Sequence, residues 1–205
     1  MEWEVDVICI PLGFPKKSPS ISHAIRGVEY SQWGAIIFLA SAGNNVNRAE
    51  GYPGWDSPVI SIYATESTGA FLGTNSIPWE KAQPLLGTYG DKVPDAILAD
   101  LRAQSPQGDF SAGTSVATAV AAGIVGLMLA YAALIPHVLP GCGAEDLYSE
   151  LKKIYGMRHL LSGMVKPVAS SQYFINPIQF CSQGSDDSKM YHAMCRAVSS
   201  KDEIT

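Results

Sequence analysis

Two polar residues at the ends of apolar segments have the side chains that acyl-transfer chemistry uses. The first is Ser115, in SAGTSVATAVAAG, directly before a long uncharged segment that is predicted to be helical. The unpaired N–H groups and the positive dipole end of a helix N-terminus stabilise negative charge on an attacked carbonyl. Gly113 allows an unusual backbone angle in the preceding turn. Ser115 is therefore a candidate nucleophile; the alternative is that Thr114 or Ser115 only caps the helix.

The second residue is Asn44, which follows the apolar run AIIFLA in the sequence Ser41-Ala42-Gly43-Asn44. Sites of parallel α/β sheets form at the carboxyl ends of the strands. An asparagine there could donate amide hydrogen bonds into a crevice. The alternative is an ordinary asparagine in a turn.

The elements that would position these residues follow a strand–helix–strand pattern. Three apolar runs have the length of buried strands: 5–10, 35–40 and 58–65. Apolar residues at helical spacing predict a helix between the first two runs, with Ser18 or Ser20 as its cap and Gly34 as its end. This order indicates a parallel sheet with a right-handed crossover.

The second half of the chain has fewer clear secondary-structure patterns. The segment 66–108 shows no helix of useful length, and the uncharged segment 111–135 predicts a buried helix that Pro136 ends. A shorter amphipathic helix is predicted in 143–156. Beyond Cys181 we expect a loose polar tail with one or two helical turns at most.

Composition excludes several classes of protein. The 205 residues have a net charge of −5 and are 47% hydrophobic, which favours one folded domain. The absence of a basic block argues against nucleic-acid binding, and the spacing of the four cysteines argues against zinc. The acidic N-terminus is unlike a signal peptide, so we expect a cytoplasmic protein. The apolar segment is long enough for a membrane span but lacks basic flanks, so we expect a core helix.

Together these segments resemble the subtilisin-like serine peptidases, the subtilases of peptidase family S8. Four motifs occur in that family's order: VDVICIPLG for the substrate-lining strand, ASAGN for the oxyanion asparagine, YPGWDSPVISIYATE for the next segment, and FSAGTSVATAVAAG for the nucleophile and its helix. The resemblance covers about residues 4–135 and continues weakly to about 180. Within the family, the chain is most similar to intracellular subtilase domains of fungal multidomain proteins.

The resemblance implies a three-layer α/β fold with a mostly parallel sheet and a central buried helix after the nucleophile. It places the C-terminal portion of the catalytic domain at 1–180, incomplete at its N-terminus, and a flexible tail at 181–205. It implies serine endopeptidase activity on protein or peptide substrates, with Ser115 as nucleophile and with Asn44 and the Ser115 N–H as oxyanion donors. The substrate cleft would be lined by Leu12, Gly13, Ser41, Ala42 and Gly43. No metal or cofactor site is identifiable, and loops for a structural calcium ion cannot be assigned from the sequence.

Two motifs of that family are missing from the chain. The triad needs an Asp motif and a His-Gly-Thr motif, and neither occurs here. We expect none of the four histidines to act as the base: His23, His137, His159 and His192. Ala119 replaces the proline of the nucleophile motif, which suits a helix. Pro11 replaces the usual serine of the substrate-lining strand and removes one backbone N–H.

A serine without a base is a poor nucleophile, so the sequence leaves three hypotheses open. The chain is the C-terminal portion of a subtilase domain, as a truncated, split or degenerate copy, whose partner is the missing N-terminal part. Alternatively, it is a non-catalytic module that binds peptides or partner domains through the same cleft. The third hypothesis is a protein anchored in a membrane by residues 116–135.

Overall fold

The computed structural model describes residues 5–31, 35–79, 84–93, 95–106, 112–139, 146–169, 171–178 and 187–199. Its centre is a six-stranded sheet with the strand order β1-β2-β3-β4-β6-β5. The strands are β1 (Val7–Ile10), β2 (Ile37–Ser41), β3 (Val59–Thr65), β4 (Leu85–Tyr89), β5 (Val165–Ala169) and β6 (Gln172–Ile175). Neighbouring strands are parallel except β5 and β6, which are antiparallel. The sheet is therefore mostly parallel, as the sequence predicts.

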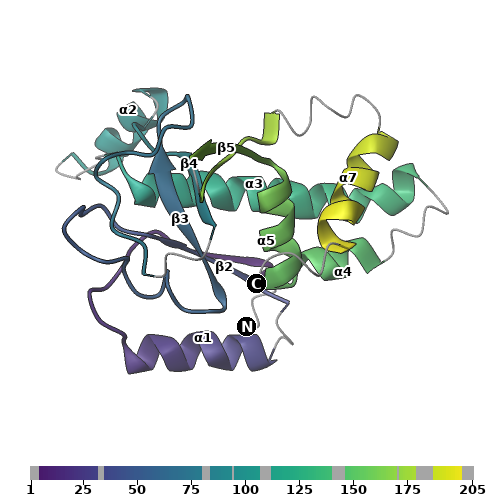
Figure 1. Ribbon diagram of the computed structural model, residues 1–205, viewed down its shortest axis with the longest axis horizontal. Helices are drawn as coiled ribbons and strands as arrows, with labels where there is room; N and C mark the ends of the chain where they lie inside the picture. Colours follow the sequence, from purple (N-terminus) through teal and green to yellow (C-terminus); the bar gives the residue numbers. More distant parts are fainter. Residues whose placement is uncertain are drawn as a thin grey trace.

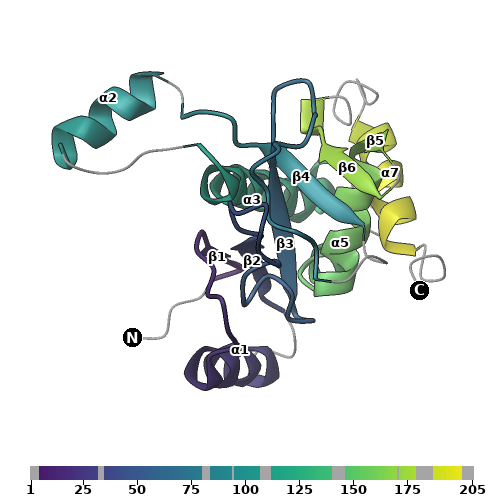
Figure 2. The same cartoon turned by 60° about the vertical axis from the view of Figure 1, so that its left-hand side comes forward.

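Helices cover both faces of this sheet, so the fold has three layers with the sheet in the middle (Figure 1). One face is covered by α1 (Pro19–Ser31). The other is covered by α3 (Thr114–Val138), with α4 (Leu147–Leu151), α5 (Ile154–Gly163) and α7 (Asp187–Ser199) beside it. Helix α2 (Asp95–Gln104) projects away from the sheet (Figure 2).

The two faces of the sheet have separate apolar cores. The core under α1 is small and contains Ile25, Ile36, Phe38, Ala40 and Val59. The larger core joins alternate residues of β2 and β3 to α3, α4, α5 and α7. Ile37 and Leu39 belong to the larger core, while Phe38 and Ala40 belong to the smaller one. This alternation explains why the predicted strand 35–40 is apolar throughout, as strands of parallel sheets covered on both faces are.

Strand β1 differs from its prediction because it is only half-buried. Its register pairs Val7 with Ile37 and Ile10 with Ala40, and within the described residues β1 pairs with β2 alone. Cys9 is exposed. The run 5–10 was expected to be a buried strand, but its position at the edge of the sheet leaves one side uncovered.

Helix α3 spans 25 residues and carries no Asp, Glu, Lys or Arg. By length and composition it could cross a bilayer. In the structure, 44% of its most apolar 18-residue stretch is buried. Its buried side packs on β1, β2, β3 and β4. Its other side exposes a stripe of four apolar residues at helical spacing: Val120, Leu127, Leu134 and Val138. This stripe is called the α3 stripe below.

Several elements of the second half differ from their predictions. Strand β4 and helix α2 lie in the segment 66–108, where no helix was expected. Pro136 does not end α3, which continues for two residues to Val138. The helix predicted in 143–156 ends at Leu151, and α5 begins at Ile154.

The tail also contains more structure than was expected from its polar start. Residues 187–199 form α7, whose Met190 and Met194 lie in the larger core. These methionines are four residues apart and so lie on one helix face. The segment 181–186 lies outside the described residues.

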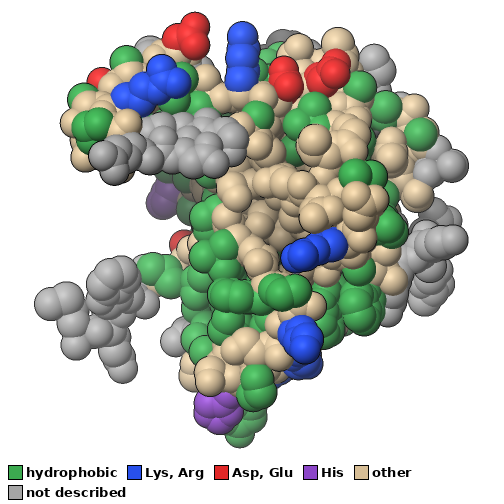
Figure 3. Space-filling view, turned by 90° about the vertical axis from the view of Figure 1, so that its left-hand side faces the viewer, with side chains coloured by type: hydrophobic (Ala, Val, Ile, Leu, Met, Phe, Trp, Pro, Cys, Tyr) green, Lys and Arg blue, Asp and Glu red, His purple; other side chains and the backbone are tan. Residues whose placement is uncertain are grey.

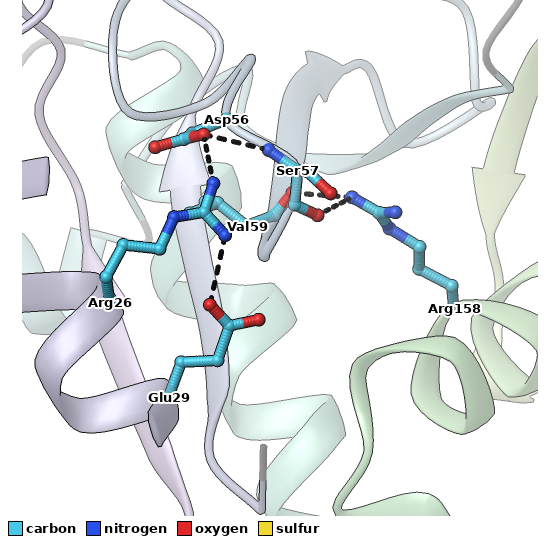
Figure 4. A network of polar contacts seen from close by, with 6 residues as sticks. All are labelled: Arg26, Glu29, Asp56, Ser57, Val59 and Arg158. Atoms are coloured by element: carbon cyan, nitrogen blue, oxygen red, sulfur yellow. Dashed lines mark hydrogen bonds and ion pairs between the residues drawn. The ribbon is translucent and has the colours of Figure 1, made fainter. Parts of the chain in front are cut away.

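Two arginines from opposite faces of the sheet hold the segment that precedes β3 (Figure 4). Arg26 of α1 forms an ion pair with the buried Asp56 at 3.0 Å. Arg158 of α5 donates to the carbonyl oxygens of Ser57 at 3.1 Å and Val59 at 2.8 Å. Burial lowers the pKa of Arg158. Both helices are thereby fixed to the start of β3, the strand whose neighbour β2 leads to Asn44.

The uncovered edge of β1 and the α3 stripe predict self-association of the chain. Unpaired strand edges and large exposed apolar patches both promote contacts between copies. We expect residues 1–205 to sediment as dimers or larger species, and Leu127→Lys with Leu134→Lys to shift the chain towards monomer. Ile97→Lys is the matched control, because Ile97 is exposed to a similar degree, 52%, on α2. A wild-type chain that sediments as a monomer at every concentration would contradict this expectation.

Candidate active site

The loop after β2 and the start of α3 are joined by Asn44 and Thr114. The Asn44 Oδ1 atom accepts the backbone N–H of Thr114 at 2.8 Å and the Thr114 hydroxyl at 3.0 Å. The Thr114 hydroxyl oxygen in turn accepts the N–H of Gly43 at 3.1 Å. The N-cap position itself is Gly113, which has no side chain to cap the helix. Asn44 therefore satisfies a first-turn N–H of α3 from a distant segment, and neither Thr114 nor Ser115 is the N-cap.

These contacts also fix the orientation of the Asn44 amide. A backbone N–H can only donate, so the Asn44 atom that faces Thr114 must be the oxygen. The Nδ2 group is then on the other side of the amide, and no described residue accepts a hydrogen bond from it. Two N–H donors of an exposed side chain thus remain for a ligand.

Gly113 makes this close approach possible. Its φ is 145°, and a Cβ built on it would lie 2.5 Å from the Asn44 Nδ2 atom. Its N–H donates to the carbonyl oxygen of Gly90 at 2.7 Å. Gly113 is therefore required both for its backbone conformation and for the space that Asn44 occupies.

Ser115 is the second residue of α3, and its hydroxyl points to the end of β1. The Oγ atom donates to the carbonyl oxygen of Pro11 at 2.6 Å. Pro11 was expected to matter through its missing N–H; in the structure its carbonyl binds the candidate nucleophile. The described histidines lie elsewhere: His23 in α1, His137 at the end of α3, His159 in α5 and His192 in α7. None of them lines the pocket at Ser115.

A pocket of about 240 Å³ lies beside Ser115 and Asn44. Of the five cleft residues named from the sequence, four line it: Leu12, Gly13, Ser41 and Gly43. Ala42 does not, because its side chain is fully buried. Sequence reasoning missed eight lining residues: Phe14, Pro15, Asn45, Arg48, Ala49, Gly51, Ser76 and Thr114.

Two glycines allow one wall of the pocket to form. A Cβ on Gly13 would lie 3.3 Å from the Cα of Gly51, and one on Gly51 would lie 3.1 Å from the Cα of Gly13. Next to them, Phe14 and Tyr52 exchange two backbone hydrogen bonds of 2.7 and 2.8 Å. The segment after β1 is thereby attached to the segment before β3. Gly51 directly precedes the YPGWD motif. This motif was the sequence feature from which this wall of the pocket could have been predicted.

Glu50 lies two residues after the pocket residue Arg48 in the sequence. It is buried and does not line the pocket. Its Oε2 atom accepts the N–H of Trp79 at 3.3 Å, and burial raises its pKa. Burial, followed by the nearby Glu50 carboxylate, raises the pKa of Tyr63. Among the described residues no group of three or more His, Cys, Asp or Glu side chains could hold a metal ion.

A serine at the start of a buried helix and an asparagine after a parallel strand thus line one pocket of an α/β fold. Residues 2–141 match the peptidase S8 family, described as the subtilase family. The chain belongs to the subtilase family. No curated protein sequence matches it.

Solved structures with a similar fold include protease and macrocyclase domains. A mutant of the protease domain of PatA matches with a TM-score of 0.58 and 15% identity, over 94% of this chain and 61% of that one. The prenylagaramide maturation protease PagA gives 0.57 and 15%, over 95% and 62%. The PatG macrocyclase domain gives 0.58 and 13%, over 95% and 52%. The chain thus spans between half and two thirds of the length of these neighbours.

The geometry at Gly113 predicts a large difference between two glycines of one region. Gly113→Ala should lower the free energy of unfolding by about 1–3 kcal/mol or more, because alanine is strained at this φ and meets Asn44. Gly123→Ala, in exposed helix with nothing within 4 Å of the added Cβ, should raise it by about 0.5–1 kcal/mol. Urea unfolding measures both. Equal effects would show that Asn44 does not pack on Gly113.

Proposed function

We propose that this site is the acyl-transfer half of a serine endopeptidase. The observation that carries the proposal is that the Ser115 hydroxyl, the first turn of α3 and the Asn44 amide meet at one pocket. Ser115 Oγ would attack the carbonyl carbon of a peptide bond. The Asn44 Nδ2 group and the Ser115 N–H, one of the first-turn donors without an intrahelical acceptor, would bind the oxygen as it becomes negative.

Attack also requires an acceptor for the serine proton. The Ser115 hydroxyl donates to the Pro11 carbonyl, which cannot act as a base at neutral pH. We infer that an Asp and a His supplied by another segment complete the site, and that this chain corresponds to the C-terminal portion of a catalytic domain. The coverage of the structural neighbours, the free edge of β1 and the exposed α3 stripe support this inference. The finer resemblance to fungal intracellular domains stays a prediction.

A second function follows if no such segment exists. The Ser115 hydroxyl keeps its proton and donates it in the hydrogen bond to the Pro11 carbonyl. In this arrangement Ser115 does not act as a nucleophile, and no base is required. The pocket and the Asn44 donors do not depend on that hydroxyl. A subtilase-like module that binds peptides without cleaving them would use the same residues, and the labelling experiment below separates the two functions.

Ser115 should react with a fluorophosphonate probe when the chain is combined with the Asp and His segments of a subtilase domain. Ser115→Ala should abolish the labelling, and Ser31→Ala, an exposed serine on α1, should leave it unchanged. Gel fluorescence measures the labelled fraction. Equal labelling of wild type and Ser115→Ala would remove Ser115 from the mechanism, and an unlabelled but folded combined protein would favour the binding module.

Two substitutions at Asn44 separate its two roles in the same combined protein. Asn44→Asp keeps an oxygen for Thr114 but loses the amide donors. It should lower kcat by about 10²–10³, the loss known for an oxyanion donor of a subtilisin, with KM little changed. Its unfolding free energy should stay near that of wild type.

Asn44→Ala loses both the donors and the acceptor. It should lower kcat by a similar factor and also destabilise the fold by about 1 kcal/mol, the cost of a lost cap. Steady-state kinetics and urea unfolding of both variants check this. A change confined to KM would make Asn44 a ground-state binding residue, and wild-type kcat in Asn44→Asp would exclude it as an oxyanion donor.

A further inference from the structure

We propose that the pocket beside Ser115 selects a peptide with an acidic side chain next to the bound carbonyl, and that Arg48 is the residue that selects it. The proposal deepens the proposed function and rests on it, because the carbonyl bound at Ser115 and Asn44 determines which side chain enters the pocket.

The backbone of Arg48 is fixed at the pocket by hydrogen bonds on both sides. Its N–H donates to the carbonyl oxygen of Asn45, and its own carbonyl accepts the N–H of Ile77, each at 2.9 Å. The next residue, Ala49, forms a parallel bridge with Ile77. Asn45, Arg48 and Ala49 all line the pocket. The side chain of Arg48 is exposed, and because its backbone is fixed at the pocket its guanidinium can reach a ligand bound there.

Arg48 is also the one charged residue among the described residues that line the pocket. Within the described part of the chain, the ion pairs are formed by Arg26, Lys152 and Lys153, and no carboxylate pairs with Arg48. Glu50, two residues away, is directed to the N–H of Trp79 instead. The pocket therefore has an uncompensated positive charge in a chain whose net charge is −5.

The surface at this end of the molecule carries charges of both signs. Figure 3 shows the end from which α3 starts in Figure 1. Lysine and arginine side chains lie both in the middle of this face and near its upper edge, where most of the acidic side chains drawn also lie (Figure 3).

The volume and the polar lining fit a carboxylate. About 240 Å³ is below the range of pockets that hold drug-sized ligands and suits one or two side chains. A guanidinium binds a carboxylate through two parallel hydrogen bonds, which an amide or an alkyl group cannot reproduce. Ser76, which also lines the pocket, accepts the N–H of Asn45 with its Oγ at 3.3 Å, so its own O–H remains for donation. Glutamate or aspartate therefore satisfies donors that a leucine would leave unpaired.

Peptide binding to the immobilised 205-residue Ser115→Ala chain tests the proposal without catalysis. Four fluorescent peptides differ at one position, with Glu, Gln, Leu or Lys. The Glu peptide should bind about tenfold more tightly than the Gln peptide, as expected for a charge-assisted pair. This ratio should fall as salt is added. Arg48→Gln should bring it close to one, and Arg48→Glu should make the Lys peptide the preferred ligand.

Arg102→Gln is the matched control, because Arg102 is an exposed arginine on α2 outside the pocket; it should leave the ratio unchanged. An equal Glu-to-Gln ratio in wild type and Arg48→Gln, or no binding of the Glu peptide, overturns the proposal. Fluorophosphonate labelling reports on the proposed function separately. An Arg48-dependent preference in a combined protein that is never labelled would keep the inference and reject the peptidase, whereas labelling without a preference would do the reverse.

Discussion

The hydrogen bond from the Thr114 N–H to the Asn44 Oδ1 atom joins two segments that are 70 residues apart, and the site depends on it. It places the end of β2 against the start of α3 and sets the direction of the Asn44 donors. Gly113 must be a glycine because the amide lies against it. The same contact brings Ser115 to the pocket whose other walls come from the segments after β1 and before β3.

The elements that make this contact were predictable from local sequence. Strands β2 and β3 are mostly apolar, and both are buried on two faces. Helix α3 follows a glycine and carries no Asp, Glu, Lys or Arg along its length, so a buried helix could be predicted there from the sequence. Ser115 and Asn44 were identified because a helix start and a strand end are positions that the sequence marks.

The remaining parts depend on contacts that the sequence does not mark. Ala42 was expected in the cleft but is buried, because alternate residues of an extended segment face opposite sides. Arg48 was missed because a single arginine in a loop forms no recognisable sequence pattern. Its place at the pocket depends on the backbone hydrogen bond from Ile77, which is 29 residues away in the sequence. The tail was expected to be loose because it starts with a polar segment, but Met190 and Met194 of α7 lie in the larger core.

The most direct test of this account is a double-mutant cycle between Asn44 and Thr114. Asn44→Ala, Thr114→Val and the double variant are compared by urea unfolding. Residues in one hydrogen-bond network show coupling free energies of about 0.5–3 kcal/mol. The account predicts a coupling in this range, since Asn44 Oδ1 accepts the Thr114 hydroxyl as well as its N–H. Effects that add to within about 0.3 kcal/mol would show that the Thr114 hydroxyl does not interact with Asn44, and would contradict this account of the contact.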